Sequence, residues 1–133
     1  MGRIDASLGL EQPDFRALCS LMENGRFWVE VSGADRISRR EPWSDAIPFA
    51  RLLVARFGER VLWGTGWPHQ NVESLPDDGR LVDLLAEIAP SEAQLHALLV
   101  SNPQRLFRFV DERRFLSHKS SALIARPPRP SMR

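Results

Sequence analysis

The 133-residue sequence has little of what several protein classes require. Its single cysteine, Cys19, excludes an internal disulfide. No apolar run approaches the ~20 residues that a membrane-spanning helix needs. The formal net charge is only +1, which favours neither a nucleic-acid-binding protein nor a trap for acidic substrates. Since residues 1–5 also do not resemble a secretory signal, we expect a cytoplasmic protein.

The remaining composition fits one ordinary globular domain. Hydrophobic residues make up 43% of the chain and charged residues 26%. Cys19 lies in an apolar helical pattern, which predicts a buried structural thiol. From about Asp111 arginine and proline dominate, so we expect a folded domain at 1–110 and a disordered basic tail at 111–133. Such a tail is usually a solvated chain end; the alternative is binding to an acidic partner or nucleic acid.

Apolar spacing, with glycine and proline as punctuation, predicts alternating helices and strands. The expected order is a helix at 13–22, a strand at 27–31, a helix at 48–57 and a strand at 61–63. Two strands joined closely by one helix form a right-handed βαβ unit, so these strands should be parallel. A polar loop is expected at 34–41, and Ser44 or Asp45 is expected to cap the helix that follows.

The second half of the chain is expected to be helical after a long loop. The elements expected there are a helix at 81–89, a second helix running to about residue 100, and a short turn from Asn102-Pro103 to Phe107. The acidic pair Asp77-Asp78 favours the N-terminus of the first helix. Ser91 and Gln94 form a capping box for the second.

The stretch Trp63-Gly64-Thr65-Gly66-Trp67-Pro68-His69 is the most informative part of the sequence. It follows the short apolar run Val61-Leu62 and turns into a polar and aromatic loop. Strands that end this way deliver polar groups to the carboxyl-terminal edge of a parallel sheet or barrel, where α/β proteins build their sites. The rest of the chain is interpreted as a scaffold around this loop.

This stretch resembles the last-strand signature Trp-Gly-Thr-Asp-Trp-Pro-His of the amidohydrolase-related (amidohydrolase 2) family. The similarity is to its lactonase branch, which includes 2-pyrone-4,6-dicarboxylate hydrolase. The resemblance extends from Met1 to Phe109. Its other parts are Met1-Gly2-Arg3, Val31-Ser32-Gly33-Ala34 with Arg36, Pro76-Asp77-Asp78, and Asn102-Pro103 with Arg105-Leu106.

The resemblance implies an α/β fold, the (β/α)8 TIM barrel. Such a barrel takes about 250 residues, so this chain would supply roughly half of it. The part implied is the C-terminal one: the helix after strand six, then strands seven and eight with their helices. In the family Met-Gly-Arg commonly follows an Asp-His pair, so the histidines of the family's active site are expected to lie outside this chain.

The resemblance also implies an activity, the hydrolysis of a small carboxylate or dicarboxylate lactone, or another cyclic ester, by an activated water. In the family the Asp of the signature is the general base, and in metal-dependent relatives also a metal ligand. Gly66 stands at that position here and can do neither. We therefore expect this truncated chain to be an inactive hydrolase; the alternative is that Gly66 merely shapes a turn.

Three residues near this position are candidates for substrate binding. By resemblance, Arg36 binds a substrate carboxylate or lactone carbonyl with its guanidinium fork; the alternative is a solvated loop arginine. Trp67 either walls a pocket or packs within the loop. His69 either contacts substrate or, as is commoner for a lone histidine in such a turn, forms a structural hydrogen bond. His96 and His118 are expected to be uninvolved.

No cofactor or metal site is expected. A zinc ion needs three or four converging ligands. The candidates near the loop are His69 and, less directly, Asp35 or Asp45, which are too few. Divalent metals occur in some relatives, but the corresponding ligands are absent from this sequence.

A second hypothesis makes the chain a non-catalytic interaction module. Half a barrel exposes two strand edges and an apolar inner face, which invite pairing with another chain. Its partners would be a second copy or a separate N-terminal half, whereas the enzyme hypothesis requires a small carboxylate or lactone. No membrane partner is expected, and nucleic acid is not favoured.

Overall fold

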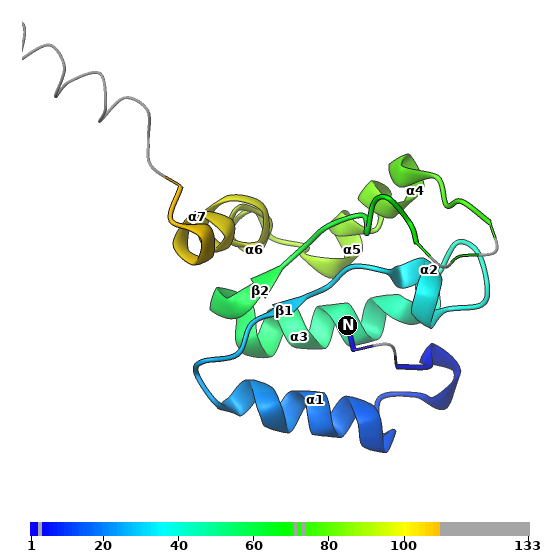
Figure 1. Ribbon diagram of the computed structural model, residues 1–133, viewed down its shortest axis with the longest axis horizontal. Coiled ribbons are helices and arrows are strands. Elements are labelled where there is room, and N and C mark those ends of the chain that lie inside the picture. Colours follow the sequence, from blue (N-terminus) through cyan, green and yellow to red (C-terminus); the bar gives the residue numbers. More distant parts are fainter. Residues whose placement is uncertain (3, 71, 73, 110–133) are drawn as a thin grey trace, which may run out of the picture.

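The computed structural model describes residues 1–2, 4–70, 72 and 74–109. Two short strands, β1 (Val29–Glu30) and β2 (Val61–Leu62), form a parallel sheet in which Val29 lies opposite Val61 (Figure 1). The predicted parallel pairing is confirmed, although both strands are shorter than expected. The pairing continues briefly, since the Val31 N–H donates to the Leu62 carbonyl at 2.8 Å. The predicted tail at 111–133 lies outside the described residues.

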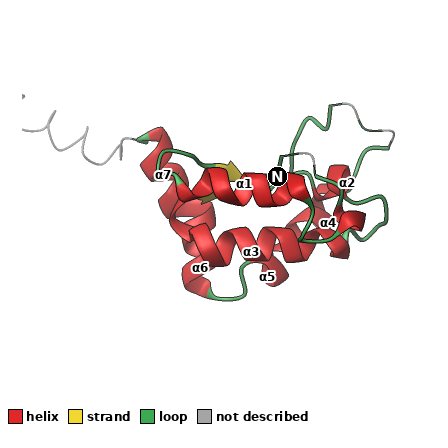
Figure 2. Ribbon diagram, turned by 90° about the horizontal axis from the view of Figure 1, so that it is seen from below, coloured by secondary structure: helices red, strands yellow, loops and turns green. Residues whose placement is uncertain are grey.

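Helix α3 (Ile47–Phe57) is the connection between the two strands, as predicted. Helix α1 (Pro13–Glu23) runs alongside it (Figures 1 and 2), and Phe15 meets Phe49 edge to face with ring centroids 4.9 Å apart. Cys19 on α1 is buried, as expected, and burial raises the pKa of its thiol. Buried side chains of this helix pair join those of the two strands and of residues 81–89 in one apolar core.

The segment predicted as a polar loop after β1 contains a short helix, α2 (Ala34–Ile37). Gly33 enters it with φ 70°, and Ala34 and Ile37 bury their side chains, so tertiary packing outweighs the polar composition. The predicted cap of α3 is also wrong. Ser44 and Asp45 lie in a 3-10 turn (Ser44–Ala46), and α3 begins directly after it without a side-chain cap.

The single helix predicted at 81–89 is two helices, α4 (Asp78–Asp83) and α5 (Leu85–Ile88), which meet at Leu84. Helix α4 begins three residues before the predicted start because Asp77 caps it, accepting from the Gly79 N–H at 2.8 Å. The Ser91–Gln94 capping box of α6 (Glu92–His96) is confirmed. None of the helices in the described part of the chain is long and apolar enough to cross a membrane.

The expected final turn is instead part of a continuous helical run. A π-helical turn (Ala97–Ser101) links α6 to α7 (Asn102–Phe107). Pro103 has no N–H to donate to a preceding carbonyl, which explains why the α-helical ladder is interrupted here. Two further 3-10 turns, Ala6–Leu8 and Gly58–Arg60, complete the described elements.

Helix α7 anchors the amino end of β2. The buried Asn102 amide donates to the carbonyls of Gly58 at 2.6 Å and Val61 at 2.7 Å. Arg105, one turn later, donates to the Glu59 backbone and lies over the Trp28 ring, 5.4 Å from its centroid. We call Trp28, 58–61, Asn102 and Arg105 the base of the sheet.

Candidate functional site

The segments that follow β1 and β2 meet at the carboxyl ends of the strands. Because the strands are parallel, both segments leave the sheet at the same edge. Arg36, on α2, reaches across and donates from Nη2 to the Gly66 carbonyl at 3.3 Å. The structure thus brings together two residues that are 30 positions apart and that the sequence singled out separately. We call Arg36 and residues 63–69 the mouth.

Gly66 lies in a turn that favours glycine. Its φ is +88°, and its carbonyl also accepts from the His69 N–H at 3.0 Å. A Cβ at this position would lie 3.9 Å from both Arg36 Nη2 and the Gly33 nitrogen, which is ordinary contact distance. There is consequently room for a Cβ beside Arg36, but the backbone conformation strains any residue other than glycine.

His69 is buried, and its Nε2 lies 2.9 Å from Asp78 Oδ1 at the start of α4. The other ring nitrogen, Nδ1, is also buried and has no hydrogen-bond partner in the described part of the chain. His69 therefore connects the mouth to α4. Its predicted contact with substrate stays a prediction. This pairing has no signal in the sequence, because Asp78 was interpreted there only as an acid at a helix N-terminus.

Trp67 does not pack within the loop, which was one of its two expected roles. The residue is 76% exposed, and its backbone N–H donates to Thr65 Oγ1 at 3.3 Å. The indole is accordingly accessible to a ligand. The other histidine in the described range, His96, is exposed on α6 and lies 3.1 Å from Ser101 Oγ. His118 lies outside the described residues.

A polar cleft of about 740 Å³ opens beside α2. Residues lining it include Asp35, Arg36, Arg39, Glu41, Gln70 and Ser74. Its volume is within the range of small-molecule sites. Arg36, which is part of the mouth, therefore also lines a cleft large enough for a small organic acid.

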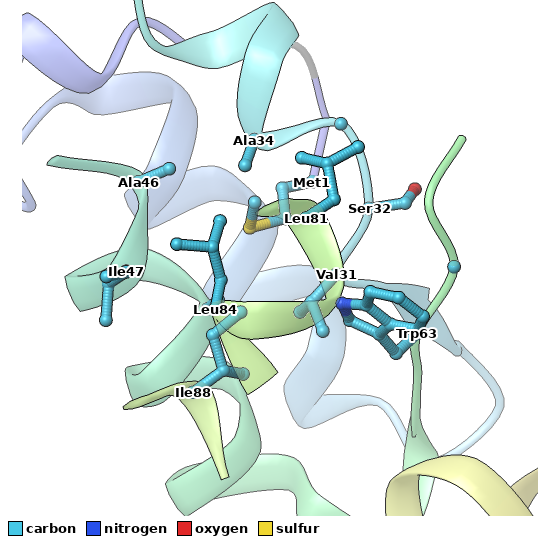
Figure 3. Close-up of a pocket in the computed structure, with 13 residues that line it drawn as sticks. Met1, Val31, Ser32, Ala34, Ala46, Ile47, Trp63, Leu81, Leu84 and Ile88 are labelled. Carbon is cyan, nitrogen blue, oxygen red and sulfur yellow. The ribbon is translucent and has the colours of Figure 1, made fainter. Parts of the chain in front are cut away.

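A second cavity lies behind the mouth, between the sheet and α3–α5. Figure 3 shows its apolar lining, with Trp63 and Val31 on one side and Ile47, Leu84 and Ile88 on the other. Its volume of about 10 Å³ is barely that of one water molecule. It is a packing gap and not a ligand site.

The acidic candidates do not form a metal centre. Both carboxylate oxygens of Asp35 and Oδ1 of Asp45 are buried without hydrogen-bond partners among the described residues. Within 1–2, 4–70, 72 and 74–109, no three His, Cys, Asp or Glu side chains gather closely enough to hold a metal ion. These residues do not fit a metal, and no metal is assigned to them.

The chain matches one family model, described as amidohydrolase, over residues 1–109. It is 48% identical over 110 residues to the 4-sulfomuconolactone hydrolase of Hydrogenophaga intermedia, covering 80% of this chain and 36% of that protein. It is 41% identical over 118 residues to the 2-pyrone-4,6-dicarboxylate hydrolase of Comamonas testosteroni, covering 80% and 39%. The chain thus spans less than two-fifths of these relatives.

Solved structures show the same similarity. A probable 2-pyrone-4,6-dicarboxylic acid hydrolase from Acinetobacter baumannii, with citric acid bound, superposes with a TM-score of 0.69 at 28% identity. That match covers 81% of this chain and 41% of the other. A putative enzyme of the same name from Pseudomonas putida gives 0.66 at 37% identity, covering 80% and 40%.

Proposed function

Because the chain belongs to the amidohydrolase family, whose model matches residues 1–109, we propose that it forms the carboxylate-binding side of a small-lactone hydrolase site. The observation that carries this proposal is the hydrogen bond from Arg36 to the Gly66 carbonyl. It joins the segments after two parallel strands at their carboxyl edge, where barrel enzymes build active sites. In this proposal β1 and β2 are the last two strands of a TIM barrel.

Arg36 is the proposed anchor for an anionic substrate group. A guanidinium has five N–H donors, and the described contacts of Arg36 use one nitrogen for Gly66. The remaining donors are available to a carboxylate. The exposed indole of Trp67, elsewhere in the mouth, offers a flat apolar face. Relatives named for a sulfomuconolactone and a pyrone dicarboxylate, and a solved structure with citric acid bound, support an acidic substrate.

The chain is proposed to bind substrate at the mouth without supplying a base at position 66. Lactone hydrolysis requires a group that accepts a proton from the attacking water. Gly66 has no side chain, and the nearby imidazole of His69 is buried against Asp78. A cytoplasmic location is part of the same proposal, since lactone hydrolases of this kind would act on small metabolites.

Equilibrium binding tests this function. Calorimetric titration with 2-pyrone-4,6-dicarboxylate should show saturable binding that weakens about ten-fold in Arg36→Gln, because one charge-assisted hydrogen bond is lost. Arg39→Gln is the matched control, since Arg39 lines the same cleft but is 88% exposed and paired with Asp5. Equal affinities for the parent chain and Arg36→Gln would contradict the proposal.

A second candidate function is an interaction module, favoured by the small sheet. Within the described residues the sheet has two strands, so each strand is paired on one side only. On the other side of β1, the Met1 amine donates to the Glu30 carbonyl at 3.1 Å. Exposed strand edges favour association with another chain, either a second copy or a complementary N-terminal half. Sedimentation equilibrium across a hundred-fold concentration range would detect a dimer; a monomer throughout would exclude the homodimer.

A further inference from the structure

The Gly66 carbonyl is the point where two parts of the mouth converge. It accepts from the His69 N–H at 3.0 Å and from Arg36 Nη2 at 3.3 Å. A carbonyl oxygen has two lone pairs, so both bonds can form at once. The direction of this carbonyl is set by the turn at 66–69, and hence the turn influences where the Arg36 guanidinium lies.

A hydrogen bond between His69 and Asp78, a residue outside the mouth, stabilises this turn. The imidazole of His69 lies with Nε2 2.9 Å from Asp78 Oδ1, on the first residue of α4. Since Nδ1 is buried without a described partner, the carboxylate favours the tautomer that carries its proton on Nε2. A buried ring with one fixed hydrogen bond restricts both its own rotamer and the backbone that carries it.

We propose that Asp78 is a positioning residue, which holds Arg36 in place through His69 and the Gly66 carbonyl. Arg36 itself is exposed and has a long side chain, so without such a contact it would sample many rotamers. Asp78 lies on α4, and its side-chain hydrogen bond in the described part of the chain is to His69 of the mouth. The consequence for ligand affinity rests on the proposed function, whereas the positioning itself does not.

The adjacent acid provides a matched control. Asp77 caps the same helix by accepting from the Gly79 N–H at 2.8 Å, with no described contact to His69. Asp77→Ala therefore removes a helix cap and leaves the His69 contact intact. Asp78→Asn keeps an oxygen acceptor for His69 Nε2, whereas Asp78→Ala removes it.

Nuclear magnetic resonance on the full chain, without ligand, measures whether Asp78 holds His69 and Arg36 in place. In Asp78→Ala we expect the His69 amide to exchange with solvent about ten-fold faster, relative to the amides of β2. The Arg36 Nε resonance should move to its unstructured value. Asp78→Asn should retain both signals, and Asp77→Ala should lower the melting temperature but leave both signals unchanged.

Two results would overturn the proposal. One is an unchanged His69 amide and Arg36 resonance in Asp78→Ala; the other is the same change in Asp77→Ala, which would indicate a general effect of α4. If Asp78→Ala does not fold, His69→Phe fills the buried space without a polar atom, and a retained Arg36 signal there would equally overturn it. Failure of the parent chain to bind a pyrone dicarboxylate would refute the proposed function while leaving these measurements interpretable.

Discussion

At the amino end of β2, side chains of α7 satisfy backbone carbonyls, whereas the mouth at the carboxyl ends of β1 and β2 presents exposed side chains. In the base, Asn102 satisfies two backbone carbonyls, and Arg105 lies over Trp28. In the mouth, Arg36 is exposed, and the exposed indole of Trp67 is available for contact. The same two strands thus connect a closed end and an open one.

Folding stability and ligand binding are expected to depend on opposite ends of the sheet. Closed hydrogen bonds to buried carbonyls contribute to folding, because their loss leaves polar groups without partners. Open donors at the carboxyl edge contribute little to folding but are available to a ligand. In barrel proteins the same division is general: the bottom of the sheet stabilises and the top carries the chemistry. Substitutions at the two ends should therefore have different consequences.

The largest effect is expected at the base. Asn102→Ala removes both donors from the Gly58 and Val61 carbonyls and should lower the free energy of unfolding by about 2–4 kcal/mol. Urea denaturation measures it. Gln104→Ala, an exposed substitution on the same helix, is the control and should change the free energy by less than about 0.5 kcal/mol. Similar values for the two variants would remove the distinction between the ends.

An intermediate effect is expected at the turn of the mouth. Gly66→Ala places a side chain at φ +88° and should cost about 1–2 kcal/mol, although the added Cβ meets no atom closer than 3.9 Å. Thermal unfolding followed by circular dichroism measures this. Gly25→Ala adds a Cβ with no atom within 4 Å and without a positive φ. If it destabilises as much, backbone strain at Gly66 is not the cause.

The smallest effect on folding is expected at Arg36. Arg36→Gln removes one exposed hydrogen bond to the Gly66 carbonyl, so the free energy of unfolding should change by less than about 0.5 kcal/mol. The same variant is predicted to lose ligand affinity, which separates binding from stability. A destabilisation above about 1.5 kcal/mol in urea would instead make Arg36 a structural residue.

The sequence predicted the elements whose apolar spacing is regular. The strand–helix–strand order fixed the parallel pairing of β1 and β2, and the motif around Gly66 located the mouth. The sequence did not predict α2, because burial of Ala34 and Ile37 is decided by packing against distant segments. It also missed the His69–Asp78 pair, since two residues nine positions apart in a loop can be brought together in many ways. Contacts of this kind depend on tertiary structure and have no local signature.

In the proposed function the mouth has an anion-binding arginine, Arg36, but no proton acceptor at position 66. A chimera tests the role of position 66: the matching stretch of the Hydrogenophaga intermedia 4-sulfomuconolactone hydrolase, 48% identical over 110 residues, is replaced by residues 1–109 of this chain. The measurement is the rate of 4-sulfomuconolactone hydrolysis with Gly66 and with Gly66→Asp, alongside the unmodified relative. We expect a rate at least ~100-fold higher with the aspartate, because it would restore a general base. Equal rates for the two chimeras would contradict it.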